Sequence, residues 1–156
     1  MNKWIVFAAI GLLSGSVAVA DDWRRDGSDA EKLEQLIRAM PNTAALMLQV
    51  GDRYNNLYWA ARQGQWEYAN YQMTEMQGVV RRNAVTRPGR ADDLQKFLDE
   101  GFEGMEEAIE AQDDERFFDS FEQMRVQCMV CHANTGYGFI VIPAEPPLPS
   151  NAALHQ

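Results

Sequence analysis

Apolar side chains recur every three or four residues along most of the chain beyond residue 28, which is the spacing of one face of an α-helix. Five stretches show this pattern. It predicts an all-α fold, with helices over 29–40, 43–62, 66–82 and 91–111 and a last helix that runs from Asp113 or Asp114 almost to Gly136.

Residues that start or stop helices stand at the ends of these stretches. Ser28 and Glu31 have the spacing of a capping box, which opens a helix at Asp29, and Pro41-Asn42 ends that helix. The other signals are a tight connection at Gln63-Gly64-Gln65, turn residues at Pro88-Gly89, a capping aspartate at 113 or 114, and a stop at Gly136.

The four stretches from residue 43 onward have similar lengths, and very short loops join the first pair and the last pair. This arrangement predicts an up-down-up-down four-helix bundle. Each helix has an apolar stripe for the core: Met47, Val50, Tyr54, Leu57 and Ala61; Trp66, Ala69, Met73, Met76 and Val80; Leu94, Leu98, Phe102, Met105 and Ile109; Phe117, Phe121, Met124, Cys128 and Cys131. Trp59 and Trp66 are expected to pack where the first two helices meet.

The pattern divides the chain into four segments. We expect a signal peptide over 1–20, an N-terminal segment with one short helix over 21–42, the four-helix domain over 43–136 and an extended tail over 137–156. The tail is predicted to be extended because Pro143, Pro146, Pro147 and Pro149 follow one another closely.

The first twenty residues resemble a secretory signal. Lys3 supplies a positive start, 4–13 are mostly apolar, and Ala18-Val19-Ala20 fits the small-x-small cleavage rule. Cleavage after Ala20 predicts a periplasmic protein without a stable membrane anchor. An uncleaved anchor is the alternative, although glycines and serines dilute the stretch and it is short for a bilayer span.

The charge balance narrows the range of partners. The chain has 14 basic and 23 acidic side chains, for a formal net charge of −9. Nucleic acid is therefore not an expected partner, because binding phosphates needs a basic surface. A redox partner with a basic docking surface is expected instead, and the bundle can also pair as a homodimer. An acidic cluster on the last two helices offers such a docking surface or is simply a solvated face: Glu106, Glu107, Glu110, Asp113, Asp114 and Glu115.

The only two cysteines and one of the two histidines fall within five residues, Cys128-Met129-Val130-Cys131-His132. This is the C-x-x-C-H pattern of covalent haem attachment. Two thiols reach the two vinyl groups of the porphyrin, and the histidine that follows is held under the iron as its proximal ligand. The sequence therefore predicts one haem c, bonded to Cys128 and Cys131, with His132 on the iron.

Three alternatives to haem attachment fit the motif less well. A thioredoxin-like redox pair needs a strand-turn-helix context and has no need of the histidine. A zinc site needs four ligands, and the one remaining histidine is His155, in the tail. A chance match is disfavoured because these rare residues coincide within one short segment.

An exported four-helix chain of this size with C-x-x-C-H near its C-terminus resembles the cytochrome c′, or class II c-type cytochrome, family. The resemblance covers roughly residues 43 to 135 and rests on Cys128, Cys131 and His132. The chain departs from the family pattern at Gly136, where the last helix usually continues. Residues 66–69 and 136–142 are also similar to a group of small periplasmic monohaem cytochromes, from which no function carries over.

The resemblance implies that the first bundle helix decides the sixth iron ligand. A methionine there gives a six-coordinate electron carrier, and an apolar side chain leaves the iron open to small gases. Met47 is the candidate ligand, although a methionine at this spacing is also common as core filling. The weaker candidates are Met40, Met73 and Met76, and the propionate partners considered are Arg53, Arg81, Arg82 and Arg125.

Three functions then compete. A one-electron carrier needs no catalytic residue, and the sequence shows none. A gas-binding haem protein for nitric oxide or carbon monoxide needs an open, apolar distal pocket. A peroxidase would need a distal acid–base pair, and His155 is the only spare histidine. We expect the carrier, with gas binding as the alternative and no enzymatic activity.

Overall fold

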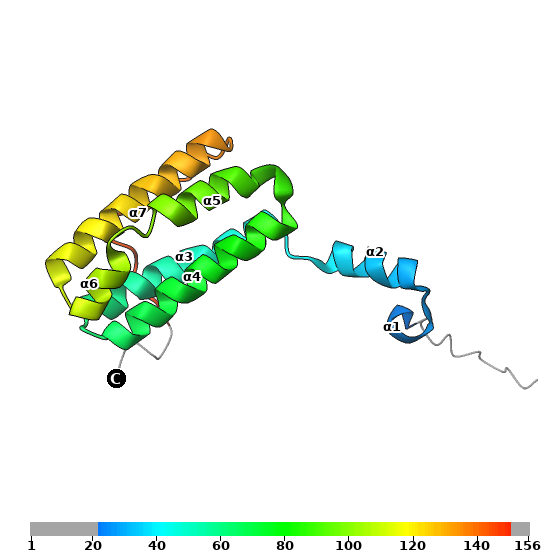
Figure 1. Cartoon of the computed structure of the whole chain (residues 1–156), viewed down its shortest axis with the longest axis horizontal. Coiled ribbons are helices and arrows are strands. Elements are labelled where there is room, and N and C mark those ends of the chain that lie inside the picture. Colours follow the sequence, from blue (N-terminus) through cyan, green and yellow to red (C-terminus); the bar gives the residue numbers. More distant parts are fainter. Residues whose placement is uncertain (1–21, 151–156) are drawn as a thin grey trace, which may run out of the picture. The chain divides into compact units, whose positions relative to one another are not determined.

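The computed structural model describes residues 22–150, which contain helices and no strand. The predicted all-α fold is confirmed, whereas the predicted signal peptide lies outside the described residues. In chain order the helices are α1 (Trp23–Asp26), α2 (Asp29–Ala39), α3 (Thr43–Arg62), α4 (Trp66–Thr86), the 3-10 turn η1 (Pro88–Arg90), α5 (Ala91–Glu100), α6 (Met105–Ala111) and α7 (Asp114–Asn134) (Figure 1). They form two compact units, one ending at Ala39 and the other beginning at Met40.

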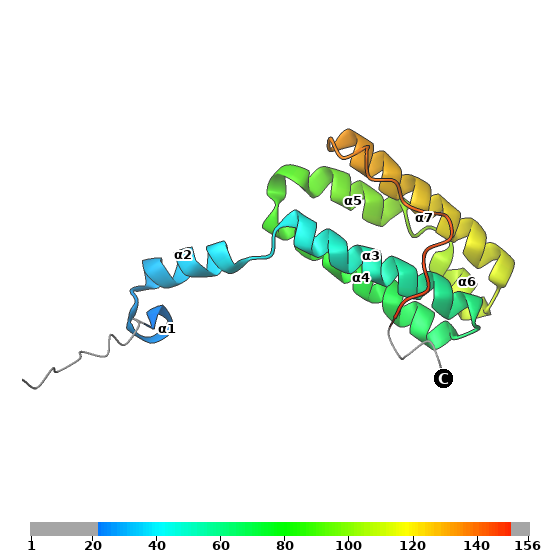
Figure 2. The ribbon, with the colours of Figure 1, turned by 180° about the vertical axis from the view of Figure 1, so that it is seen from behind.

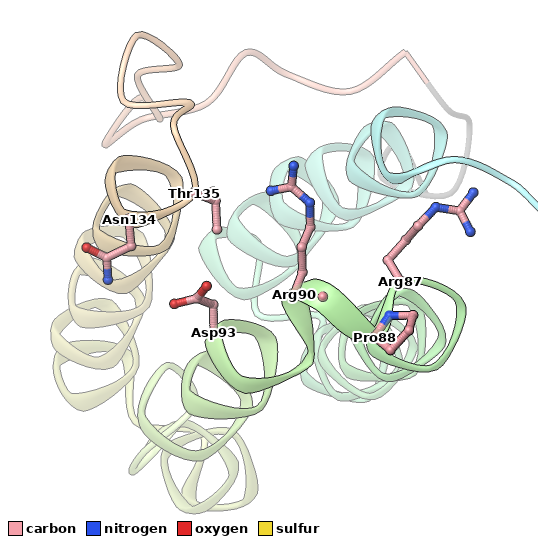
Figure 3. A pocket seen from close by; sticks show the side chains of 7 residues that line it. Arg87, Pro88, Arg90, Asp93, Asn134 and Thr135 are labelled. Carbon is pink, nitrogen blue, oxygen red and sulfur yellow. The ribbon is translucent and has the colours of Figure 1, made fainter.

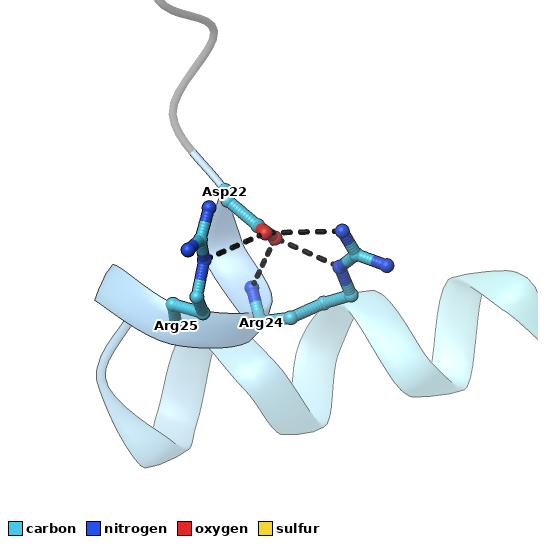
Figure 4. A network of polar contacts seen from close by, with 3 residues as sticks. All are labelled: Asp22, Arg24 and Arg25. Atoms are coloured by element: carbon cyan, nitrogen blue, oxygen red, sulfur yellow. Dashed lines mark hydrogen bonds and ion pairs between the residues drawn. The ribbon is translucent and has the colours of Figure 1, made fainter.

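In the first unit, Asp22 caps the short helix α1. Its carboxylate accepts hydrogen bonds from the Arg24 backbone N–H at 3.2 Å and from Nε of Arg24 at 2.8 Å, and it pairs with Arg25 at 3.2 Å (Figure 4). The Arg24 guanidinium lowers the pKa of Asp22. A four-residue helix is too short to show hydrophobic periodicity, and for that reason the pattern of the sequence does not predict it.

The predicted capping box opens α2. The backbone N–H of Ser28 donates to the Glu31 carboxylate at 2.7 Å, and the backbone N–H of Glu31 donates to the Ser28 hydroxyl at 3.3 Å. The helix ends at Ala39, one residue before the predicted Met40. Its apolar side chains Leu33, Leu36 and Ile37 are all more than half exposed, so α2 contributes no buried residue to a core.

In the second unit, α3 and α4 form an antiparallel pair. On this pair α5 packs against α4 and α7, and α6 packs against α7 and α4 (Figure 1). The helix α3 also contacts α7, with Tyr54 and Phe121 stacked at a ring-centroid distance of 4.5 Å. The core contains most of the predicted stripe residues, among them Leu57, Met73, Met76, Val80, Leu94, Phe102, Met105, Ile109, Phe117 and Met124. Trp59 and Trp66 pack against it while partly exposed.

The prediction of a single helix over 91–111 is wrong, because this stretch forms two helices, α5 and α6. Gly101 ends α5, and a Cβ there would lie 2.7 Å from the Phe97 carbonyl oxygen. Gly104 then takes a φ of 73°, a left-handed conformation that favours glycine and cannot continue a helix. Apolar spacing runs on through the break, and for that reason periodicity alone does not predict it.

The other boundaries are close to prediction. Helix α3 has the predicted bounds, with Asn42 accepting the Ala45 N–H at 2.8 Å, and Gly64 makes the tight connection at a φ of 70°. Helix α4 runs four residues beyond the predicted Arg82, because a helix-breaking residue is reached only at Pro88. Asp113 caps α7 as predicted, and Gly136, at a φ of 85°, follows its end.

Beyond α7, residues 137–150 form neither helix nor strand, and the last six residues of the predicted tail lie outside the described residues. The tail runs back along α7 and then across α3 (Figure 2). Side chains of both helices hold its carbonyl oxygens: Arg125 donates to Ile142 at 3.1 Å, Tyr54 to Pro143 at 2.6 Å and Trp59 to Pro146 at 3.0 Å.

Candidate functional site

The C-x-x-C-H residues occupy the last two turns of α7. Cys128, Cys131 and His132 have the spacing i, i+3 and i+4, which places them on one face of the helix. Both cysteines are free thiols and half-buried, and Cys128 packs against the core. The structure therefore brings the predicted attachment residues together on the inward side of one rigid element.

Burial controls the chemistry of both thiols. It raises the pKa of Cys128 to about 12, and it raises the pKa of Cys131, where the carboxylate of Asp93 adds to the effect and the guanidinium of Arg90 opposes it. Both residues are therefore protonated near neutral pH. Reactive C-x-x-C pairs of the thioredoxin type have a lowered thiol pKa at a helix N-terminus, so this pair, near a helix C-terminus, has the opposite electrostatics.

A zinc site also lacks support from the geometry. Among residues 22–150, no three His, Cys, Asp or Glu side chains form a group that could hold a metal ion. A structural zinc site requires four such ligands from the protein. The donor set of two neutral thiols and one imidazole instead suits a group that is held by carbon–sulfur bonds and one axial nitrogen.

His132 is partly exposed and is surrounded by backbone groups. Its Nδ1 lies 3.5 Å from the carbonyl oxygen of Ile140 in the tail. Its own carbonyl oxygen accepts a hydrogen bond from the N–H of Tyr137 at 2.7 Å. The hydroxyl of Thr135 donates to the carbonyl oxygen of Cys131 at 2.8 Å, so polar contacts fix the last turn of α7.

An open cleft of about 530 Å³ lies beside the motif, between the α4–α5 connection and the end of α7 (Figure 3). Its lining residues are Arg87, Pro88, Gly89, Arg90, Asp93, Asn134 and Thr135. The guanidinium of Arg90 lies 5.0 Å from the centre of the Tyr137 ring and donates to the Tyr137 hydroxyl at 3.2 Å. The sequence did not predict that Arg87 and Arg90 line a cleft, because the pattern at 87–90 indicates only a turn.

Met47 lies half-buried on α3 and packs against the core. It is seven residues before Tyr54, and Cys128 is seven residues after Phe121, the stacking partner of Tyr54. Seven residues rise about 10.5 Å along a helix. Figure 2 shows that α3 and α7 run in opposite directions. Equal offsets from the stacked pair therefore place Met47 and Cys128 at the same level of the two helices.

The other candidate methionines are less well placed. The side chain of Met40 is 41% exposed at the first residue of the second unit, outside the core. Met73 and Met76 are buried within the core cluster of α4. Of the four candidates, Met47 is the one on α3 that packs against the core while partly buried.

Three of the four arginines considered as propionate partners bond to other groups of the protein through their side chains. Arg53 donates to Gln72 at 2.9 Å, Arg81 donates to Gln77 at 2.9 Å, and Arg125 binds Glu122 and the Ile142 carbonyl. Arg82 is exposed on α4. Of the four, only Arg125 stands on α7 beside the motif. The predicted acidic cluster on α6 and α7 is exposed apart from Asp113, which caps α7.

One buried polar atom near this end of the bundle has no partner. Asn83 on α4 is fully buried, and its Oδ1 accepts a hydrogen bond from the Thr43 hydroxyl at 3.3 Å. Its Nδ2 has no hydrogen-bond partner in the described part of the chain. Buried donors without partners are rare in folded proteins.

Comparison with protein families, with curated proteins and with solved structures finds no match for this chain. None of the helices within 22–150 has the length and apolar character needed to cross a membrane.

Proposed function

We propose that this protein is a c-type cytochrome that carries one haem and transfers single electrons. The observation that supports it best is the arrangement on α7, where two protonated, half-buried thiols and one imidazole share a face. Cys128 and Cys131 hold the haem, and His132 is the proximal ligand of its iron. When bound, the haem supplies a one-electron ferric–ferrous couple.

Attachment needs no oxidant. Each thiol adds across one vinyl double bond: a carbon–sulfur bond forms, the carbon–carbon π bond breaks, and the thiol hydrogen ends on the neighbouring carbon. The two cysteines must therefore arrive reduced, as free thiols. The secretory signal predicted over 1–20 delivers the chain to the periplasm. Because the periplasm is oxidising, the two thiols must react with haem before they are oxidised.

Within the all-α fold, we propose that residues 43–136 form a four-helix bundle of the cytochrome c′ type. In it α3, α4 and α7 are three of the helices, and α5 and α6 together take the place of the remaining one. The packing of α3 on α4, α5 on both α4 and α7, and α3 on α7 supports this arrangement. The tail departs from that family and lies along α7 and α3 (Figure 2).

The carrier function needs a distal ligand and a docking partner. Met47 is the proposed distal ligand, because it lies level with Cys128 on the facing helix. The exposed acidic cluster on α6 and α7 is the proposed docking surface for a basic redox partner. No catalytic residue is assigned.

Gas binding is the second candidate. The observation that favours it is the apolar character of the α3 face toward α7, where Met47 and Val50 pack against the same core as Cys128. An apolar distal pocket binds carbon monoxide or nitric oxide when no protein ligand occupies the sixth position. The state of Met47 therefore decides between the two candidates.

Covalent attachment is the first test. The full chain is expressed with c-type maturation enzymes, and haem retention is measured after acid–acetone extraction for wild type, Cys128→Ala, Cys131→Ala and the double variant. We expect retention in wild type, reduced holoprotein yield in the single variants and complete loss in the double variant. His132→Ala is the matched control, because it keeps both cysteines and removes only the iron ligand. Where the thioether bonds form, this variant should retain haem but lose the native Soret and α bands. Extractable haem in wild type would refute the proposal.

A further inference from the structure

The tail wraps closely around the proximal residue of the proposed haem site. The N–H of Tyr137 donates to the carbonyl oxygen of His132 at 2.7 Å, and the N–H of Ile140 donates to that of Tyr137 at 2.8 Å. These two bonds close a turn that brings the Ile140 carbonyl oxygen within 3.5 Å of His132 Nδ1. The turn thus presents a backbone acceptor to the proximal imidazole.

We infer that the backbone carbonyl of Ile140 is the acceptor that orients the His132 imidazole, so that Nδ1 carries the proton and Nε2 faces the iron. This inference rests on the proposed function. Ile140 is a positioning residue that acts through His132. The contact to Nδ1 is made by the backbone carbonyl oxygen, so the role belongs to the carbonyl and not to the side chain.

The rest of the tail holds this carbonyl in place. Two residues further on, the Ile142 carbonyl accepts from Arg125 of α7, which lies two turns before His132. The next two anchors come from α3, where Tyr54 binds the Pro143 carbonyl and Trp59 binds the Pro146 carbonyl. Donors on two packed helices therefore hold the tail beyond the turn. The Ile140 carbonyl thus belongs to an anchored segment.

The chemical effect of the contact has a definite direction. A neutral imidazole has one N–H, and a carbonyl at Nδ1 leaves the lone pair of Nε2 for a metal. Such a partner also fixes the ring and raises the basicity of the ligand. A more basic imidazole donates more electron density, which favours ferric iron. The Ile140 carbonyl therefore lowers the reduction potential of the holoprotein.

Proton exchange in the wild-type holoprotein tests the contact directly. Low-spin, six-coordinate ferrous haem is diamagnetic, whether Met47 or added carbon monoxide is the sixth ligand, so the Nδ1 proton of His132 can be observed by NMR in either case. We expect it to exchange with solvent several-fold more slowly than the same proton of imidazole bound to free haem. Exchange as fast as in that reference would overturn the inference.

A full-chain variant tests the effect on potential. Tyr54→Phe with Trp59→Phe removes two donors that hold the tail, and we expect a higher reduction potential and faster exchange of the Nδ1 proton. Two control variants should leave the reduction potential and the exchange rate unchanged. Tyr68→Phe removes a hydroxyl that lies away from the tail and bonds to Asn56 at 3.4 Å. Ile140→Ala changes the side chain and keeps the carbonyl.

The alternative role of the tail gives the opposite sign. A tail that only shields haem from water would, once loosened, lower the potential, because solvent favours the more highly charged ferric state. A lower or unchanged potential in the double variant therefore overturns the inference while the proposed function stands. Wild-type protein without covalent haem would overturn the proposed function as well, so the two failures are distinguishable.

Discussion

The hydroxyl of Tyr54 donates a hydrogen bond of 2.6 Å to the carbonyl oxygen of Pro143, which joins α3 to a residue 89 positions further along the chain. Burial raises the pKa of Tyr54, so the hydroxyl remains protonated and a donor at any physiological pH. The ring stacks on Phe121 at the same time. One side chain thus connects α3, α7 and the tail.

Loss of this hydroxyl should destabilise the fold measurably. We expect Tyr54→Phe to lower the free energy of unfolding by about 1 kcal/mol, the typical net contribution of one hydrogen bond, because the ring and its stacking remain. The measurement is the urea midpoint at unchanged slope. Tyr68→Phe, whose hydroxyl bond is long at 3.4 Å, should cost less. An equal or larger loss in that control would contradict the tail-anchoring role.

The glycines at positive φ should differ in their tolerance of alanine. Gly64 and Gly104 have similar φ values of 70° and 73°, and a left-handed alanine costs about 1–2 kcal/mol. A Cβ at Gly64 meets open space, whereas one at Gly104 lies 3.3 Å from the Ser120 hydroxyl oxygen. We expect the midpoint of urea unfolding to fall in both variants, and further in Gly104→Ala. Equal shifts would show that Ser120 gives way freely.

The sequence predicts a local feature well when adjacent residues determine it. Ser28 and Glu31 predicted the start of α2, and Gly64 predicted the connection that ends α3, because capping and positive-φ signals act over a few residues. The break after α5 escaped prediction because Leu98, Phe102 and Met105 keep helical spacing across it. Periodicity records which side chains face the core and carries no information on φ.

In the candidate site, too, the sequence predicts some of the groups and not others. The sequence predicts Cys128, Cys131 and His132 as site residues because haem attachment needs these residue types in one short motif. The Ile140 carbonyl and the cleft arginine Arg90 were not predicted, because they reach the motif through the fold of the tail and of the α4–α5 connection. A backbone acceptor has no residue type, so no sequence pattern can identify it.

The capping box of α2 should respond to acid. The backbone N–H and hydroxyl of Ser28 lower the pKa of the Glu31 carboxyl below its ordinary value of 4.5. A lowered pKa in the folded state means that this contact stabilises α2 above the ordinary value and is lost as the pH falls through the lowered one. We expect an NMR titration of Glu31 to show the lowered pKa, and helix content of α2 to decline with it.

Variants at Ser28 separate the two causes. Ser28→Ala removes the hydroxyl but keeps the backbone N–H, the larger cause, and should return the Glu31 pKa only partly toward 4.5. Ser28→Pro removes both donors and should return it fully. Glu31→Gln should make the helix content independent of pH in this range. A Glu31 carboxyl that titrates normally in wild type would rule out the capping box in solution.

The last prediction decides between electron transfer and gas binding, and it concerns Met47. Met47→Leu keeps an apolar side chain of similar volume, so a packing role alone predicts a stability loss below about 1.5 kcal/mol and an unchanged spectrum. As an iron ligand, Met47 blocks the sixth position and stabilises the ferrous state. We then expect Met47→Leu to lower the reduction potential, produce a high-spin spectrum and admit carbon monoxide. Paired carbon monoxide and redox titrations of the variant and wild type measure this, with Met76→Leu in the core of α4 as the control. Equal affinities and potentials would remove Met47 as the ligand, and rapid carbon monoxide binding by wild type would favour the gas-binding function.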